Sequence, residues 1–235
     1  MTVIQDCVPI DYVPIDYRTY SLEGKGYNII ADLDILEKRI WDASFPFQDK
    51  RQDTGHAETV TYFALKLTKI LGGDREITIP AAILHDTGWS QMTQTELDLF
   101  YINEWERYEP VLRARHQETG SGLAKTILSG IGNNDQNSYT LRPDQIDEIS
   151  EIISQHDTRK GFCSNNDGIV RDADKLWRFT KPCLQILIDL RGSKNMESAI
   201  AETSKAISRE GFFYSPISAG IAMAELDNVR KSYSS

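Results

Sequence analysis

The residues with the clearest chemical potential are a histidine and an aspartate at the end of an apolar run. His85 and Asp86 directly follow the apolar stretch 81–84 (AAIL). A buried helix of this composition carries both side chains into surroundings of low dielectric constant, where an unpaired carboxylate is costly to keep charged. A bound cation removes that cost. One imidazole nitrogen together with carboxylate oxygens suits a borderline transition metal better than calcium or magnesium, so we expect a metal ion beside His85 and Asp86.

The chain contains four histidines, and the spacing of apolar residues predicts that each faces inward on a different helix. His56 starts one apolar series at helical spacing, His116 lies within a second, and His156 ends a third. On a further helix Asp174 faces inward, whereas Asp172 does not. A single inward histidine is more often a core residue than a ligand, but four histidines and two aspartates on such faces indicate one metal site. The residues concerned are His56, His85, Asp86, His116, His156 and Asp174.

Helices must position these side chains, and no run of alternating polar and apolar residues predicts a strand. Asp34 with Glu37 predicts a helix start and Gly72-Gly73 a helix stop. Pro80 suits the first turn of the helix that carries His85. Helices are expected over 34–43, from 56 to the Gly72-Gly73 stop, across 169–178, and near 196–207 and 215–231, the last two as scaffold. The fold class is therefore all-α.

Breaks between these helices are also predicted. Segments rich in Gly, Asn, Asp and Ser indicate loops over 129–138 and 164–168. Gly120 and Gly122, beside the His116 stripe, are expected to permit close approach of another helix. Thr93 with Glu96 can cap the helix that follows the His85 segment.

Length and composition favour one large domain. The chain has 235 residues, of which 40% are hydrophobic, which is enough for one core and hardly enough for two. Residues 1–31 are expected to form an N-terminal extended arm, because the prolines of the duplicated segment 8–17 (VPIDY-VPIDY) disfavour a helix. The arm either packs on its own domain or crosses a partner subunit in a homodimer. Residues 32–235 form the helical domain, with its motif core over about 49–181.

Charge and cysteine content limit the partners and the compartment. A net charge of -9 and a pI near 5.0 argue against nucleic acid or an anionic membrane as a general partner. No basic-plus-apolar leader and no stretch of about 18 apolar residues is present. The three cysteines (Cys7, Cys163 and Cys183) are spaced unlike a disulfide framework or a zinc cluster. We expect a cytoplasmic protein with a small ligand.

The ordered set of histidines and aspartates resembles the HD-domain superfamily of metal-dependent phosphohydrolases over approximately residues 49–181. The local strings 82–88 (AILHDTG) and 170–176 (VRDADKL) are similar to that superfamily as well. The resemblance implies a single-domain helical bundle of the HD type with the metal site in its core. It also implies a first ion held by His56, His85, Asp86 and Asp174, and a second ion to which Asp86 bridges and which His116 and His156 complete. Asp86, His116 and His156 would then lie at the catalytic centre.

The expected cofactor is a pair of transition-metal ions, divalent or mixed-valence, with iron favoured and manganese as the alternative. In a hydrolase, a hydroxide between the ions attacks a small phosphate ester or anhydride. In the oxygenase alternative, implied by resemblance to the inositol oxygenases and the phosphonate-cleaving members, a mixed-valence di-iron centre uses O₂ on a phosphonate-like or polyol-like substrate.

We favour the hydrolase because the stretch from His156 to Asp174 is short and in this resembles the hydrolases of the superfamily. In addition, the loop before His56 lacks the tyrosine and glutamate pair expected of the phosphonate enzymes. Against this, Trp89 stands where many two-metal hydrolases carry a lysine. A regulatory module that binds metal without turnover is a third alternative, less favoured because every expected ligand is present.

Several basic residues near the expected ligands favour a small anionic substrate. Lys160 follows His156 by one helical turn, Arg171 precedes Asp174 by one turn, and Arg178 follows Asp174 by one turn. The full set of candidate substrate-binding residues is Lys160, Arg171, Arg178, Arg51 and Lys175.

Overall fold

The computed structural model describes residues 29–51, 53–99, 105–133 and 140–234, and within these ranges the chain forms helices and no strands. This confirms the all-α class. The helices are α1 (Ile29–Asp32), α2 (Ile35–Ser44), η2 (Phe45–Phe47), α3 (His56–Leu71), α4 (Arg75–Leu84), η3 (Thr87–Gln91), α5 (Gln94–Asp98), α6 (Trp105–Asn133), α7 (Pro143–Gln155), α8 (Asn165–Trp177), α9 (Lys181–Arg191), α10 (Met196–Ser204) and α11 (Pro216–Ser234). None of them combines the length and the apolar character that a membrane crossing requires.

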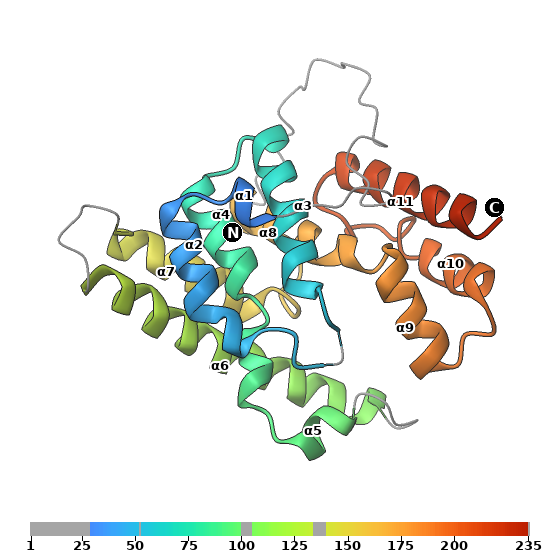
Figure 1. Cartoon of the computed structure of the whole chain (residues 1–235), viewed down its shortest axis with the longest axis horizontal. Coiled ribbons are helices and arrows are strands. Elements are labelled where there is room, and N and C mark those ends of the chain that lie inside the picture. The colour runs from blue at the N-terminus through green and yellow to red at the C-terminus, as the bar shows by residue number, and fades with distance from the viewer. Residues whose placement is uncertain (1–28, 52, 100–104, 134–139, 235) are drawn as a thin grey trace.

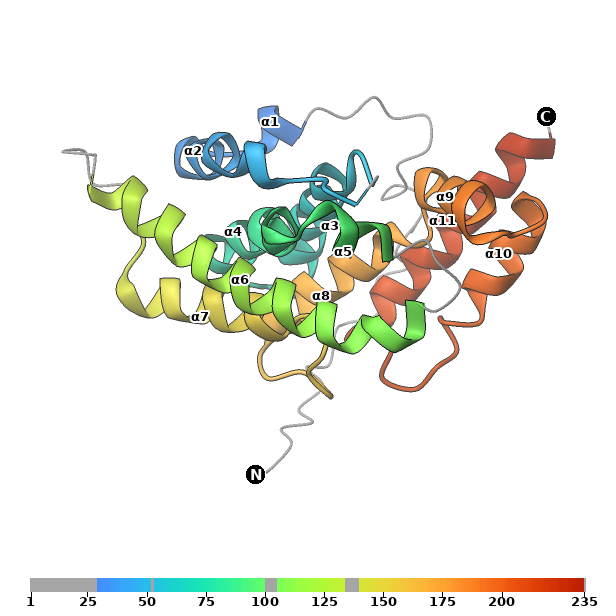
Figure 2. The same cartoon turned by 90° about the horizontal axis from the view of Figure 1, so that it is seen from below.

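Helix α3 lies in the interior of the bundle, packed against α4 and α8 (Figure 1). Helices α6 and α7 run side by side on one face, and α1 and α2 lie on the opposite face (Figure 2). The C-terminal helices α9, α10 and α11 gather at one end, where α11 packs on α8. The start of α3 and the C-terminal ends of α4 and α7 meet between the middle of α6 and the last turn of α8.

The N-terminal boundary can be followed only in part. The duplicated segment 8–17, and with it nearly all of the expected arm 1–31, lies outside the described residues. Its last positions begin α1, where Ile29 is fully buried, and Leu33 directly after α1 is also buried. Residues 29–31, which were expected to belong to the arm, are therefore part of the helical domain.

Helix α3 shows how the sequence places an inward-facing residue at a helix start. Gly55 precedes it with φ 85°, a conformation that favours glycine, and the Asp49 carboxylate accepts the Gly55 N–H. Gly72, also left-handed with φ 69°, ends the helix where the sequence predicts a stop. Between these ends the inward face is apolar, so His56 is directed into the protein. The buried apolar residues of that face include Val60, Phe63 and Leu67.

Helix α4 starts earlier than the sequence indicates. Its N-cap is Asp74, whose side chain accepts the Glu76 N–H, and Pro80 consequently lies inside the helix rather than in its first turn. The cap and the burial of residues 77–84 outweigh the one intrahelical hydrogen bond that a proline cannot donate. The apolar face of α4 thus carries His85, at its C-terminal end, into the interior.

Two glycines allow η3 to approach α6. A Cβ atom at Gly88 would lie 1.9 Å from the backbone oxygen of His116, and one at Gly120 would lie 3.2 Å from the Gly88 nitrogen. Gly122, for which the same role was expected, is exposed and has nothing within 4 Å of its Cβ position. The Gly88–Gly120 contact brings the chain next to Asp86 within reach of His116.

Two predicted loops were wrong in part, and one helix was missed. Helix α6 continues to residue 133, into the expected loop 129–138, and the expected loop 164–168 is the start of α8, because the Ser164 hydroxyl caps the Asp167 N–H. Helix α9 was not predicted, although Pro182 in its first turn and Gly192 with φ 76° at its end are the usual helix boundary signals.

The C-terminal helices are attached to α8 by buried polar groups. Asp172 accepts the N–H groups of Tyr214 and Ser215 at 2.8 and 2.9 Å, and Lys175 donates to the Phe212 carbonyl. Burial raises the pKa of Asp172 to about 6. Asp172 is fully buried at the junction between α8 and the segment before α11, so the expectation that it does not face inward is wrong.

Candidate metal centre

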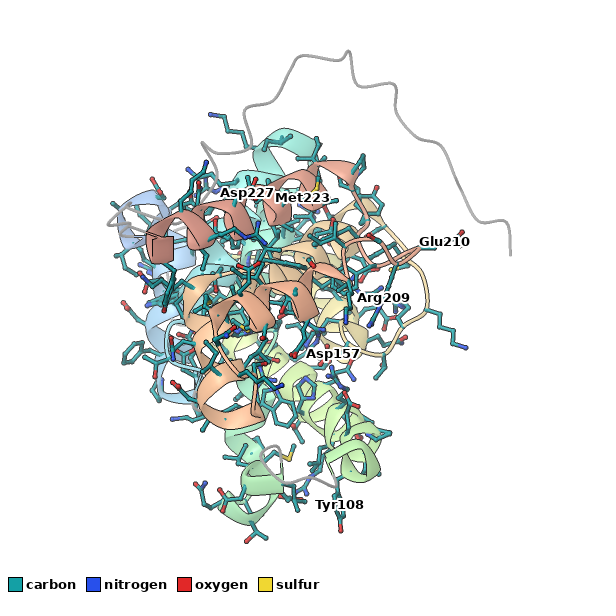
Figure 3. All side chains as sticks on the ribbon, turned by 90° about the vertical axis from the view of Figure 1, so that its right-hand side faces the viewer. Tyr108, Asp157, Arg209, Glu210, Met223 and Asp227 are labelled. Carbon is teal, nitrogen blue, oxygen red and sulfur yellow. The ribbon has the colours of Figure 1, made fainter. Side chains whose placement is uncertain are left out.

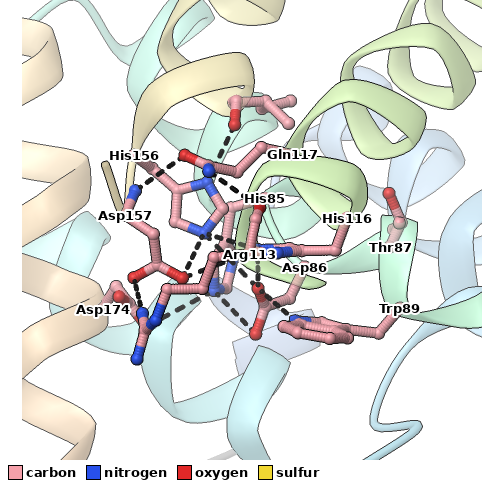
Figure 4. A network of polar contacts seen from close by, with 12 residues as sticks. His85, Asp86, Thr87, Trp89, Arg113, His116, Gln117, His156, Asp157 and Asp174 are labelled. Atoms are coloured by element: carbon pink, nitrogen blue, oxygen red, sulfur yellow. Dashed lines mark hydrogen bonds and ion pairs between the residues drawn. The ribbon is translucent and has the colours of Figure 1, made fainter. Parts of the chain in front are cut away.

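Five helices and the turn before η3 bring the six expected ligands together, and Figure 4 labels all of them except His56. They are His56 at the start of α3, His85 and Asp86 after α4, His116 in α6, His156 after α7, and Asp174 in α8. All four imidazoles are buried, and the side chains of Asp86 and Asp174 are 14% and 16% exposed. The exposed edge of the cluster therefore belongs to its carboxylates.

One half of the cluster is formed by His56, His85 and Asp174. The two Nε2 atoms of His56 and His85 lie 3.0 Å apart, and Asp174 Oδ1 is 3.5 Å from each of them. Asp86 Oδ2 lies 3.1 Å from His56 Nε2 and 3.6 Å from His85 Nε2. Two nitrogens and two carboxylate oxygens thus face one point.

The other half is formed by His116 and His156. Their Nε2 atoms lie 3.4 Å apart, and Asp86 Oδ1 is 3.5 Å from the first and 3.4 Å from the second. The two oxygens of Asp86 therefore face different histidine pairs, as a bridging carboxylate would.

The histidine rings are oriented with nitrogen lone pairs toward the cluster. The Nδ1 atoms of His85 and His156 each lie 2.8 Å from a backbone carbonyl oxygen, of Ala82 and Ile153 respectively. A carbonyl only accepts, so these Nδ1 atoms carry the proton and Nε2 presents its lone pair. Once deprotonated, the Nε2 atoms of His85 and His156 each face a second imidazole nitrogen, at 3.0 and 3.4 Å, and a metal ion at either position would be bound by both nitrogens. The donor set therefore fits transition-metal ions.

A family model of the HD domain matches residues 54–178, slightly more than half of the chain and the segment that contains the whole cluster. The chain belongs to the HD domain family. This family lies within the metal-dependent phosphohydrolase superfamily, and together with the His/Asp cluster it indicates a site for divalent metal. No curated protein and no solved structure matches the chain significantly.

The electrostatics of this HD domain keep its carboxylates charged. Burial by itself raises the pKa of Asp86, but Arg51 and His85 hold that pKa well below its usual range. The pKa of Asp174 is likewise lowered, because His85 and His56 outweigh burial. For His85, burial is outweighed by the Asp86 and Asp174 carboxylates, which raise its pKa to about 9. Negative charge is therefore concentrated where cations are expected.

Arg51 and Trp89 hold the Asp86 carboxylate in place. Arg51 forms ion pairs with Asp86 and Asp53, and its guanidinium lies 4.8 Å from the centre of the Trp89 ring. Trp89 donates from Nε1 to Asp86 Oδ1 at 3.1 Å and stacks on His116 with ring centroids 4.0 Å apart. The tryptophan that replaces the expected lysine of many two-metal hydrolases thus orients two members of the cluster.

A cavity of about 330 Å³ opens onto the cluster, a volume suited to a small ligand. Its outer wall comes from α9, α10 and the residues after α10, all beyond the matched HD segment. Helices after residue 178 therefore shape the cavity as well as supporting the fold. The wall residues are Cys183, Ile186, Leu187, Thr203, Ala206 and Arg209. Figure 3 looks onto this side of the molecule and labels Arg209 together with Asp157 of the inner wall.

Only some of the basic residues that were expected to bind substrate line the cavity. Arg51 and Arg178 line the cavity. Arg171 does not: it is buried, and its guanidinium donates to the carbonyls of Gly161 and Arg159. The expectation that it leans toward the cluster is therefore wrong, because α8 directs it to the loop before the helix.

The two remaining basic residues also lie away from the cavity lining. Lys175 donates to the Phe212 carbonyl and lies over the rings of Phe162 and Phe212, so it belongs to the junction with the C-terminal helices. Lys160 is exposed in the loop after α7 and is not among the residues that line the cavity. One helical turn along the sequence does not bring it inward, because α7 ends before residue 156 and the chain changes direction.

The charged cavity residues that were not identified from the sequence are Asp53, Arg113, Asp157 and Arg209. Asp157 follows His156 directly, and Arg113 precedes His116 by almost one turn, so both lay next to expected ligands. Arg209 lies in a segment that was expected to be scaffold. Asp157 and Arg113 could have been found from their spacing, whereas the position of Arg209 depends on how the C-terminal helices fold back.

Proposed function

We propose that this protein is a metal-dependent phosphohydrolase that uses two transition-metal ions, iron or manganese, to hydrolyse a small phosphate ester or anhydride. The observation that carries the proposal is Asp86, whose two oxygens face separate histidine pairs at the base of an arginine-lined cavity. The HD domain supports the reaction class, and the cluster supports the binding of divalent metal.

Different residues of the cluster would bind the two ions and keep their ligands in place. His56, His85, Asp174 and one oxygen of Asp86 would hold one ion, while His116, His156 and the other oxygen would hold the second. When bound, a pair of ions supplies a water of lowered pKa and neutralises charge on a phosphoryl group. Trp89 keeps Asp86 and His116 in place through its hydrogen bond and its ring contact.

Four arginines give the cavity its preference for an anion. Arg51 and Arg113 lie at its inner end, where they pair with Asp86 and Asp157, and Arg178 and Arg209 lie among its lining residues. Guanidinium groups bind phosphoryl oxygens through charge-assisted hydrogen bonds. Ile186 and Leu187 add an apolar surface to the same lining. A substrate with a phosphoryl group and a compact, partly apolar remainder fits this lining.

The oxygenase alternative uses the same six ligands, so the experiment must separate the two reactions. Phosphate release from a panel of phosphoesters and nucleotides is measured under argon with manganese. Oxygen uptake with hydroxylated phosphonates and polyols is measured in air with iron. Phosphate release without O₂ supports the proposal. Turnover that depends strictly on O₂, with oxygen incorporated into a carbon product, contradicts it in favour of the oxygenase.

A further inference from the structure

We infer that Asp157 is a ligand of the second metal position, completing it in the way that Asp174 completes the first. The inference rests on the proposed function, in which the cluster holds two ions. It adds a seventh protein ligand to the six that the sequence pattern identifies, and it gives both positions the same donors: two histidines, a terminal aspartate and one oxygen of Asp86.

The geometry of the two aspartates is closely similar. Asp157 Oδ2 lies 3.6 Å from His116 Nε2 and 3.8 Å from His156 Nε2. On the other side of Asp86, Asp174 Oδ1 lies 3.5 Å from the Nε2 atoms of both histidines of its pair. The donor atoms of His116, His156 and Asp157 all fall within 4.8 Å of one another, close enough to share one ion.

The backbone around Asp157 fixes where its side chain points. Asp157 follows His156 at the end of α7, and its N–H donates to Gln117 Oε1 at 3.0 Å. Gln117 in turn donates from Nε2 to the carbonyl of Arg113 at 2.8 Å. The first bond ties the end of α7 to α6, and the second, within α6, orients Gln117. Asp157 thereby lies beside the cluster (Figure 4), where it lines the cavity.

The two oxygens of Asp157 have separate partners. Oδ1 forms an ion pair with Arg113 Nη1 at 2.8 Å, while Oδ2 faces His116 and His156. A metal-ligating carboxylate commonly uses one oxygen for the ion and the other for a neighbouring donor, which fixes its orientation. Arg113 therefore supports Asp157 as a ligand instead of competing for the same oxygen.

The charge of the completed cluster also favours this arrangement. Three carboxylates (Asp86, Asp157 and Asp174) surrounded by neutral imidazoles nearly balance two divalent cations. The side chain of Asp157 is 11% exposed and forms an ion pair with Arg113. A charged carboxylate at this depth, directed at two imidazole lone pairs, is a suitable donor for a cation.

The test measures binding of manganese by calorimetry and metal analysis in the full-length protein. Wild type is expected to bind two ions. Asp157→Asn should keep the first ion and bind the second at least about 10-fold more weakly, because an oxygen ligand of that position is lost. Asp157→Glu, which keeps the carboxylate, should recover part of that affinity. Thermal unfolding of each metal-free variant establishes that it is folded.

A double variant tests whether Asp157 binds the second ion directly or acts only through its negative charge. In Asp157→Asn/Arg113→Gln the positive charge is removed together with the negative one, so the net charge beside the cluster equals that of wild type. If Asp157 is a ligand, the second ion stays weakly bound in the double variant. Wild-type affinity in the double variant overturns the inference and leaves the proposed function standing, whereas a wild type that binds only one ion overturns both.

Discussion

The matched HD segment and the C-terminal helices contribute to the same cavity in different ways. Residues 54–178 supply every histidine and every cluster carboxylate, held at helix ends by caps, carbonyls and the Gly88–Gly120 contact. Helices α9 and α10 and the residues after them supply the opposite wall, with apolar side chains and Arg209. We propose that the HD segment determines which chemistry is possible and that the C-terminal part selects the substrates that reach the cluster.

The largest effect is expected from Asp86, because both halves of the HD cluster depend on it. Asp86→Ala should abolish binding of both ions and reduce turnover to background, as measured by metal analysis and phosphate release. His156→Ala should mainly empty the second position. Equal loss of both ions in the two variants would contradict the bridging role of Asp86.

The C-terminal wall should affect the substrate and not the metal. Arg209→Ala is expected to lower kcat/KM by about 10- to 100-fold, the loss of one charge-assisted hydrogen bond, with two ions still bound. Lys205→Ala, an exposed lysine that does not line the cavity, is the matched control and should leave the kinetics unchanged. Loss of metal in Arg209→Ala would contradict the view that the HD segment binds the metal and the C-terminal wall binds the substrate.

The pH dependence of metal binding should belong to the HD segment alone. In the metal-free protein the pKa of His85 is raised from 6.5 to about 9, so a proton must leave when an ion binds. Metal affinity should therefore fall on acidification below about pH 9, by up to about tenfold per pH unit for one proton. Calorimetric titrations across this range measure the slope, and Arg209→Ala should share it.

The same pKa shift has a consequence for stability. Because the pKa of His85 is higher in the folded protein, protonation of His85 stabilises the folded metal-free protein. This contribution to the free energy of unfolding is fully present below pH 6.5 and is lost as the pH rises through about 9. Thermal unfolding of the metal-free protein should therefore show this loss between the two values. A metal affinity that does not change with pH, or a stability that rises from this group over the same range, would contradict the assignment of the proton to His85.

The smallest effects are expected at two residues of the HD segment that the sequence places near the site. Arg171→Ala should destabilise the fold by about 1–3 kcal/mol, because two backbone carbonyls lose a charged donor, while kcat/KM of the folded protein is retained. Lys160→Ala should change stability by less than about 0.5 kcal/mol. Chemical denaturation and steady-state kinetics measure both. A raised KM in either variant would return an anion-binding role to that residue.

The success and failure of sequence reasoning follow from how locally each feature is encoded. The inward direction of His56 or His116 follows from helical spacing and a stop at Gly72, which are local properties, so these positions were predictable. The direction of Arg171 was not, because a long side chain one turn from a ligand can bond to the adjacent loop equally well. The cavity wall was least predictable, since it depends on the contacts through which Asp172 and Lys175 fold the C-terminal segment back onto α8.

The central claim is that Asp86 joins two metal positions, and a crystal structure of the manganese-loaded protein tests it most directly. An anomalous difference map should show two peaks about 3.5–4 Å apart, one beside His56, His85 and Asp174 and the other beside His116 and His156, with Asp86 between them. A single peak at full manganese occupancy, or two peaks that do not share Asp86, would contradict the claim.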